Sequence, residues 1–275
     1  MKNFTVDLTK EYPVKGGSLD CILMDVPFDG ETDWKRPAVI VVPGGGYGMV
    51  SKREGEPIAS AFWARGFQTF VLTYLCQPDG VRYPEQLCEL AAAVDYVKKH
   101  ADVFHVNKDE IFIVGFSAGG HLTGNLAVDY ASVSVRIGAT LDCKPTAVGL
   151  CYPVISHKYG HLGSHANMLY GYSETEKAAL YKEVDLDEKV NENTAPAFIW
   201  ATATDMVVPV ENSLSFASAM AKYKVPFELH IYPEGIHGLS TADYEVNPVN
   251  QHEKRISRWV DDCSAFFRKF VKESY

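Results

Sequence analysis

The amino-acid sequence predicts an α/β fold in which helices cover both faces of a mostly parallel central β-sheet. Short, continuously apolar runs such as 38–42 and 111–114 predict strands that are buried on both faces. Segments with apolar residues at helical spacing, such as 85–99, lie between these runs. Parallel strands need crossover connections, and helices usually supply them. The alternation therefore indicates a layered α/β architecture.

The individual elements follow from the same two patterns along the chain. Strands are expected at 18–26, 38–42, 69–74, 111–114, 147–152, 197–201 and 227–232. Helices are expected at 58–65, 85–99, about 118–130, 209–223 and 255–271. The first of these helices has Ile58, Ala61 and Phe62 on one face. The helix that starts at about 118 is rich in small residues, and the last helix is amphipathic.

The segment 156–194 interrupts this alternation because it is too long for an ordinary connection between two strands. It contains three histidines and ends in an acidic half, with a run at 183–188 that we expect to be a solvated face. We interpret the segment as a lid inserted over the carboxyl edge of the sheet. Residues 1–275 are then expected to form a single domain that includes this insertion.

Composition is typical of an ordinary soluble globular protein. Of the 275 residues, 47% are hydrophobic and 22% are charged, which excludes a disordered, collagen-like or coiled-coil chain. The net charge is −9 and no long basic run offsets it, so neither nucleic acid nor an anionic membrane is expected as the main partner. The six cysteines are scattered without a CxxC pair, and we expect them to be mostly buried free thiols.

The N-terminus and the longest apolar runs bear on location. Charges interrupt the first ten residues, which therefore lack the apolar core of a secretion signal. The longest apolar runs are far shorter than the ~20 residues of a membrane span. We expect a cytoplasmic protein, although a chain trimmed of a signal peptide would look the same.

The sequence Gly115-Phe116-Ser117-Ala118-Gly119 follows the apolar run 111–114 and opens a helix. A G-x-S-x-G motif between a strand and a helix presents its serine on a sharp turn above the sheet edge. The glycines remove Cβ atoms that would clash, and the helix N-terminus behind the serine favours developing negative charge. The context predicts a nucleophilic serine rather than a structural turn.

An acid and a histidine are expected after this serine, in that order. Asp205 follows the strand 197–201 and His237 follows the strand 227–232, so both lie at the edge of the sheet that carries Ser117. The alternatives are a helix-capping Asp205 and a surface His237, with His252 as the weaker substitute for the histidine. In the favoured arrangement Ser117 attacks a carbonyl carbon, His237 moves the proton and Asp205 orients the imidazole.

The sequence 43–48, Pro-Gly-Gly-Gly-Tyr-Gly, directly follows the strand 38–42. It lacks the lysine of a P-loop and the spacing of a dinucleotide fingerprint, which argues against nucleotide binding. An oxyanion hole fits better, because its backbone N–H donors must approach the substrate oxygen without an intervening side chain. We expect Gly44 and Gly45 to supply such donors, together with Ala118, the residue after the nucleophile.

Together these motifs resemble those of the α/β-hydrolases. The PGGGY loop, the sequence GFSAGGH around Ser117, the TDMVVP around Asp205 and the GIHG around His237 are similar to a bacterial esterase/lipase family. That family includes acetyl-xylan-esterase-like and other carbohydrate-esterase-like enzymes and is related to the hormone-sensitive-lipase type. The resemblance runs from about residue 38 to the final helix, with Pro43 in place of the usual histidine of H-G-G-G. It implies ester hydrolysis, with deacetylation of sugars as one form, and no cofactor.

Three tyrosines near the predicted active edge, Tyr47, Tyr74 and Tyr83, are candidates for substrate binding. Their rings could stack on a sugar or aryl group, and simple packing is the equally good alternative. Four residues after Ser117, His121 is expected to serve packing because its position on the helix points it away from the chemistry.

Three histidines, His157, His161 and His165, have the spacing of metal ligands on one helix. Gly160 and Gly163 interrupt that helix and no carboxylate completes the set, so we expect no metal and assign them to the lid or the pocket wall.

The sequence therefore predicts a serine carboxylesterase acting on a small-molecule ester, such as an acetylated carbohydrate. One alternative is a serine peptidase of the prolyl-oligopeptidase-like type, because the G-x-S-x-G-G elbow also occurs there. Another is a non-enzymatic binder on a hydrolase scaffold, although such proteins typically lose one of the three catalytic residues. The acyl and alcohol specificity and the oligomeric state stay open at this point.

Overall fold

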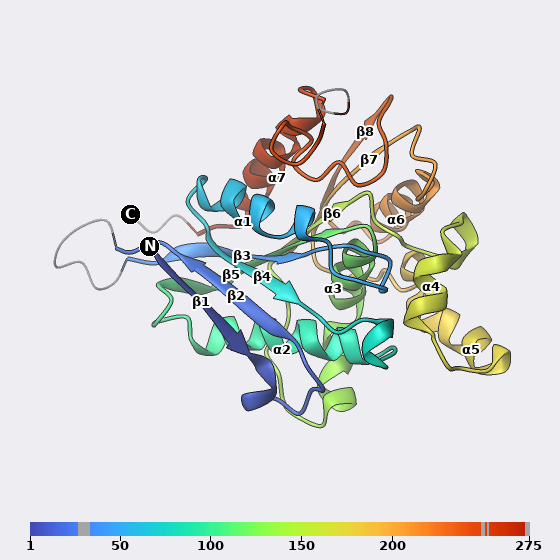
Figure 1. The fold of residues 1–275 in the computed structure, drawn as a ribbon, viewed down its shortest axis with the longest axis horizontal. Coiled ribbons are helices and arrows are strands. Elements are labelled where there is room, and N and C mark those ends of the chain that lie inside the picture. The colour runs from blue at the N-terminus through green and yellow to red at the C-terminus, as the bar shows by residue number, and fades with distance from the viewer. Residues whose placement is uncertain (27–33, 249–250, 252, 273–275) are drawn as a thin grey trace.

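The computed structural model describes residues 1–26, 34–248, 251 and 253–272. Eight strands form one sheet in the order β1-β2-β4-β3-β5-β6-β7-β8 (Figure 1). Their bounds are Lys2–Asp7 for β1, Ser18–Leu23 for β2, Arg36–Val42 for β3, Gln68–Thr73 for β4, Val106–Phe116 for β5, Ala147–Cys151 for β6, Ala197–Thr202 for β7 and Phe227–Tyr232 for β8. The strands from β4 to β8 across the sheet pair in parallel, and β1 and β2 add an antiparallel edge.

The apolar strands are buried on both faces, as their continuous hydrophobicity predicts. In β3 the side chains of Ala38, Ile40 and Val42 enter one core, and those of Val39 and Val41 enter the other. This split follows from the two-residue period of a strand, which sends alternate side chains to opposite faces. Because the cores on both faces exclude water, every side chain of a central strand can be apolar, and the strand is a continuous apolar run in the sequence.

Helices cover both faces of the sheet (Figure 1). Their bounds are Glu56–Trp63 for α1, Glu85–Lys99 for α2, Ala118–Ile137 for α3, Leu162–Met168 for α4, Glu174–Val184 for α5, Glu211–Lys222 for α6 and Trp259–Arg268 for α7. The apolar residues of α2, α3 and α6 belong to one core, and those of α1 and α7 belong to the other. The predicted α/β fold, mostly parallel and covered on both faces, is confirmed.

Two differences from the predicted elements have a physical cause. Strand β1 was not expected, because five of its six residues are exposed and it therefore carries no apolar pattern. Helix α3 continues beyond the predicted end at 130, through a kink at Asp129, where the backbone departs from helical geometry.

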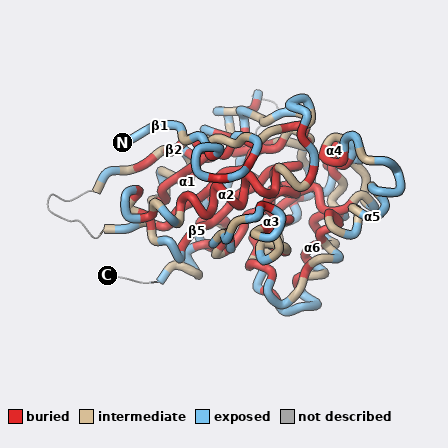
Figure 2. Tube along the Cα trace, turned by 90° about the horizontal axis from the view of Figure 1, so that it is seen from below, coloured by how far each residue is buried: buried red, intermediate tan, exposed pale blue. Residues whose placement is uncertain are grey.

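The segment 156–194 connects β6 to β7 and contains α4 and α5. Helix α4 contacts the loop after β3, because the Asn167 side-chain amide donates to the Gly46 carbonyl at 2.9 Å. The segment therefore touches the carboxyl edge of the sheet. Helix α5 lies further out and is mostly exposed (Figure 2). Residue 173 caps it, since the Ser173 hydroxyl and the Glu176 carboxylate satisfy backbone N–H groups of its first turn.

All six cysteines are buried free thiols, as predicted. Burial raises the pKa of each thiol, to about 12 for Cys21 and Cys76 and to about 11 for Cys88 and Cys143. These groups are therefore poor nucleophiles at neutral pH. Over the described part of the chain, the helices are too short or too polar to cross a membrane.

Candidate active site

Ser117 lies between the end of β5 and the start of α3, on the turn that its motif predicts. Its backbone has φ 53° and ψ −117°, a conformation that side chains rarely adopt. A Cβ at Gly115 would collide with Thr123 and with the backbone of Gly119. A Cβ at Gly119 would collide with the carbonyls at the end of β3. The two glycines thus permit the turn and let α3 begin directly against the sheet edge.

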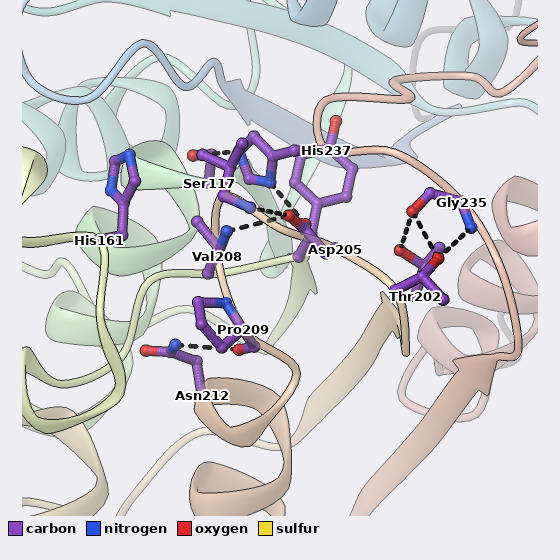
Figure 3. Close-up of polar contacts among 12 residues, drawn as sticks. Ser117, His161, Thr202, Asp205, Val208, Pro209, Asn212, Gly235 and His237 are labelled. Atoms are coloured by element: carbon purple, nitrogen blue, oxygen red, sulfur yellow. Dashed lines mark hydrogen bonds and ion pairs between the residues drawn. The ribbon is translucent and has the colours of Figure 1, made fainter.

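Three side chains from separate loops meet at this turn (Figure 3). The Nε2 atom of His237 lies 2.9 Å from Ser117 Oγ, and its Nδ1 atom lies 2.7 Å from Asp205 Oδ2. A carboxylate can only accept, so Nδ1 carries the proton and the neutral ring accepts from the serine hydroxyl at Nε2. The structure therefore brings together the serine, histidine and aspartate that the sequence singled out.

The Asp205 carboxylate is held from both sides. Its Oδ1 atom accepts hydrogen bonds from the backbone N–H groups of Val207 at 2.8 Å and Val208 at 2.9 Å. Its Oδ2 atom is left for His237. The N-cap of α6 is Val210, so Asp205 does not cap that helix. The side chain of Asp205 is 1% exposed, and this burial keeps water from competing for His237.

The glycine loop after β3 passes within contact of Ser117, since a Cβ built on Gly44 would lie 3.0 Å from Ser117 Cβ. The expectation that Gly44 supplies an oxyanion donor is wrong for this structure. Its N–H donates to the buried carboxylate of Glu54 at 2.9 Å and so points into the protein. Gly44 is glycine for another reason, because its Cβ would also lie 2.6 Å from the Phe116 carbonyl.

The other N–H groups around Ser117 are differently placed. Across the described residues, we find no acceptor for the N–H groups of Gly45, Gly46 and Ala118. The Gly44 carbonyl accepts from Ser51 N at 3.0 Å, and the Gly45 carbonyl accepts from Gly48 N at 3.0 Å. In a trans peptide the N–H points opposite to the carbonyl of the preceding residue. The N–H of Gly45 therefore points away from Ser51, and that of Gly46 points away from Gly48. Gly46 is thus a candidate donor beside Gly45 and Ala118.

The three tyrosines proposed for substrate binding are buried, which corrects that interpretation. Tyr47 and Tyr74 are each 2% exposed and Tyr83 is 3% exposed, so none offers a ring to a substrate. The Tyr74 hydroxyl donates to the Pro43 carbonyl at 2.8 Å, and this bond supports the start of the glycine loop. The Tyr47 hydroxyl lies 2.8 Å from His121 Nδ1. Packing, the alternative reading for these tyrosines, describes them correctly.

His121 packs inside the protein, as expected. Its Nε2 atom lies 2.8 Å from the Val184 carbonyl, so Nε2 carries the proton and Nδ1 accepts from Tyr47. Burial lowers the pKa of His121 to about 4, and the ring is neutral. The ring therefore ties the glycine loop to the end of α5 through α3.

The three histidines of segment 156–194 do not share a helix, because His157 lies on a 3₁₀ turn, His161 precedes α4 and His165 lies on α4. His157 stacks on Tyr181 at 3.8 Å and its Nδ1 atom lies 2.7 Å from Asp185 Oδ2. His165 is 1% exposed on α4, beside the ring of His121. Among the described residues, no group of three His, Cys, Asp or Glu side chains is arranged to hold a metal ion.

His161 differs from these two because it faces the site. Its ring lies 6.4 Å from that of His237, with an angle of 25° between the planes (Figure 3). The Ser164 hydroxyl lies 2.9 Å from His161 Nδ1 and fixes the ring. Burial, with His237 close by, lowers the pKa of His161. The pattern of three histidines pointed to this part of the chain but not to the single ring that borders the site.

The strand order, the strained serine turn and the three-residue hydrogen-bonded chain are the features of an α/β-hydrolase. A sequence model of the BD-FAE family matches residues 24–220, and the chain belongs to that family. It is 38% identical over 218 residues to the endo-1,4-β-xylanase B of Butyrivibrio fibrisolvens, covering 78% of this chain and 34% of that protein. It is 30% identical over 243 residues to the acetylxylan esterase of Xylanibacter ruminicola, covering 86% of this chain and 46% of the relative.

Solved structures agree with the fold. The acetyl ester-xyloside bifunctional hydrolase of Caldicellulosiruptor lactoaceticus is 30% identical and superposes with a TM-score of 0.82, covering 98% of this chain and 97% of that one. The carboxylesterase Cest-2923 of Lactobacillus plantarum is 26% identical with a TM-score of 0.86, covering 100% of both chains. The chain thus spans a third to a half of the two curated relatives and nearly all of these two solved proteins.

Proposed function

We propose that this protein is a serine carboxylesterase that hydrolyses short-chain esters. The observation that carries the proposal is the continuous chain of hydrogen bonds from Asp205 through His237 to Ser117. A serine activated by a neutral, correctly oriented imidazole is the nucleophile of acyl-transfer enzymes. The names of the relatives and solved structures, which include acetylxylan esterase and carboxylesterase, support ester hydrolysis over the other acyl transfers.

In the proposed mechanism Ser117 Oγ attacks the ester carbonyl carbon while its proton moves to His237 Nε2. The tetrahedral intermediate then expels the alcohol, which takes that proton, and an acyl-serine is left. A water molecule attacks the acyl-serine in the same way, and the carboxylic acid and free serine are released. Asp205 stays ionised throughout, because its role is to hold Nδ1–H and stabilise the imidazolium.

We assign the oxyanion hole to the N–H groups of Gly45, Gly46 and Ala118. Gly45 and Gly46 follow Gly44, whose Cβ position lies 3.0 Å from Ser117 Cβ, and Ala118 opens α3, whose dipole also favours negative charge. The loss of one such donor costs about 3–4 kcal/mol in the activation barrier of comparable enzymes. Pro43 in place of histidine leaves these N–H groups in the chain, and Tyr74 holds the carbonyl of Pro43.

The substrate class that we propose is an acetylated carbohydrate, cleaved at its acetyl ester. The printed names of the xylanase, the acetylxylan esterase and the acetyl ester-xyloside hydrolase support it. We further propose that 1–275 form one catalytic domain and that 156–194 acts as its lid. His161 supports the second part, because its ring borders the site and could donate to or accept from a sugar hydroxyl.

The test of this function is the substitution Ser117→Ala, with turnover of p-nitrophenyl acetate as the measurement. We expect kcat to fall about 10⁴-fold or more, because the nucleophile is lost. Ser60→Ala on the exposed side of α1 is the matched control and should keep wild-type turnover. Equal turnover by wild type and Ser117→Ala would refute the proposal.

A substrate panel tests the substrate class. It contains acetylated xylo-oligosaccharides, longer acyl esters and proline-aminoacyl naphthylamides. Release of the naphthylamide alone would indicate a peptidase instead of an esterase.

A further inference from the structure

A buried carboxylate, Glu54, lies beneath the site in the turn after the glycine loop. The residue is 5% exposed. Its Oε2 atom accepts from the N–H of Gly44 at 2.9 Å, and its Oε1 atom accepts from the hydroxyl of Tyr152 at 2.7 Å. Each carboxylate oxygen thus has its own hydrogen bond, and both donors are uncharged groups. Burying a carboxylate costs free energy unless its oxygens are hydrogen-bonded, and here both oxygens are.

Tyr152 continues the contact to the other side of the site. Its hydroxyl also accepts from the backbone N–H of Ser240 at 2.9 Å, three residues after His237. The Ser240 hydroxyl donates to the Arg53 carbonyl at 2.6 Å, next to Glu54 in the chain. The edge of the Tyr152 ring packs against His237, with ring centres 5.0 Å apart and planes at 70°. One carboxylate therefore connects the glycine loop with the histidine loop.

The bond to Gly44 lies one peptide before the first proposed oxyanion donor, Gly45. Glu54 holds the N–H of Gly44 and Ser51 holds its carbonyl, so the peptide planes on both sides of Gly44 are fixed. The second of these planes carries the N–H of Gly45. An error of about 1 Å in the placement of such groups costs about 10²-fold in rate.

We infer that Glu54 is a positioning residue that keeps the oxyanion donors and His237 in a fixed relation to Ser117. This inference rests on the proposed function and deepens it. Glu54 acts through Gly44 and Tyr152 and does not reach the reacting atoms itself. A carboxylate is required because it offers two acceptor atoms, one for the N–H and one for the hydroxyl. Glutamine would offer only one, and its amide group would face one of these donors.

The test is Glu54→Gln, with kcat and KM on p-nitrophenyl acetate as the measurement. We expect kcat to fall about 10²-fold while KM changes less than about twofold, since the variant disturbs alignment rather than substrate binding. Glu56→Gln, an exposed position on α1, is the matched control and should behave as wild type. A thermal unfolding curve shows whether each variant is folded. Wild-type kcat for Glu54→Gln would overturn the inference.

A second variant keeps the inference testable if Glu54→Gln does not fold. Tyr152→Phe leaves the bond between Glu54 and Gly44 but cuts the link to Ser240, and we expect kcat to fall while KM is kept. The effects of residues that act as one unit are not additive. The kcat of the double variant should therefore be about the same as that of the less active single variant. An unchanged kcat for Tyr152→Phe, or additive losses, would overturn the link. Ser117→Ala is measured alongside, and only its activity bears on the proposed function.

Discussion

The hydrogen bonds of Asp205 determine how an amide would sit in its place. Two backbone N–H groups bind Oδ1, so the amide oxygen of Asp205→Asn would keep that position and its NH₂ would face His237. His237 Nδ1 would then accept a hydrogen bond instead of donating one, so the ring proton would move to Nε2 and Nε2–H would point at Ser117. The imidazole could no longer take the serine proton. We expect kcat on p-nitrophenyl acetate to fall about 10⁴-fold, with little change in KM.

The control for this variant is Asp7→Asn on β1. Asp7 Oδ1 also accepts from a backbone N–H two residues on, that of Thr9 at 3.0 Å, and from the Thr9 hydroxyl at 2.7 Å instead of a histidine. This variant should keep full activity. If Asp205→Asn retained more than a tenth of the wild-type kcat, the role of Asp205 in setting the tautomer would be wrong.

Single residues also show which parts of the site the sequence could predict. Ser117, Asp205 and His237 were predictable because each follows a strand, and parallel strands deliver their following residues to one edge. The direction of the Gly44 N–H was not, because Glu54, ten residues away, determines it. Tyr74 was ambiguous for the same reason. Whether a tyrosine hydroxyl meets substrate or a backbone carbonyl depends on contacts between distant segments, and no local pattern records them.

At the level of elements, the start of α3 depends on its closeness to β3. Gly119 lies so near the carbonyls at the end of β3 that a methyl group cannot fit without moving the helix. We expect Gly119→Ala to lower the free energy of unfolding by about 3 kcal/mol, because the neighbours are backbone atoms that cannot turn aside. Because α3 carries Ser117 at its N-cap, activity should fall as well. Urea unfolding and p-nitrophenyl acetate turnover measure the two effects.

The matched control is the same substitution in α4. A Cβ on Gly163 meets nothing within 4 Å, so alanine adds helix propensity without a clash. Gly163→Ala should therefore keep or raise stability, by up to about 0.8 kcal/mol. If both alanine variants had the same free energy of unfolding, the close contact between α3 and β3 would not be what requires glycine at position 119.

Elements were predictable from sequence to the extent that burial gave them a pattern. The amphipathic helix α2 was correctly identified, and so was the apolar part of β5 at 111–114, whereas the polar first half of β5 was not predicted. Strand β1 is stabilised by pairing with β2, and its exposed side chains carry no sign of that pairing. The paths of α4 and α5 were not predictable, because contacts such as that of Asn167 with Gly46 set them.

For the whole molecule, buried ionisable groups make stability depend on pH. Burial lowers the pKa of His121 to about 4 and that of His165 to about 3. The unfolded chain protonates these rings below about 6.5, whereas the folded protein does not. The unfolded state therefore binds more protons as the pH falls from about 6.5 to 4, and stability is lost there. Burial raises the pKa of Glu89 to about 7, which has the opposite sign between pH 7 and 4.5 and offsets part of this loss.

His165 offers the sharpest measurement of this effect, because both of its ring nitrogens lack a hydrogen-bond partner within the described structure. His165→Met fills the same buried space with a side chain that cannot be protonated. Between pH 7 and pH 5 the wild type should lose about 2 kcal/mol of unfolding free energy through this ring alone, at about 1.4 kcal/mol per pH unit below 6.5. The unfolding free energy of the variant should fall by about 2 kcal/mol less over the same range, as measured by urea unfolding at pH 7, 6 and 5.

The control is His105→Asn, at the partly exposed position before β5. It should keep the pH dependence of the wild type. An unchanged dependence in His165→Met would show that proton uptake by this ring is not coupled to unfolding.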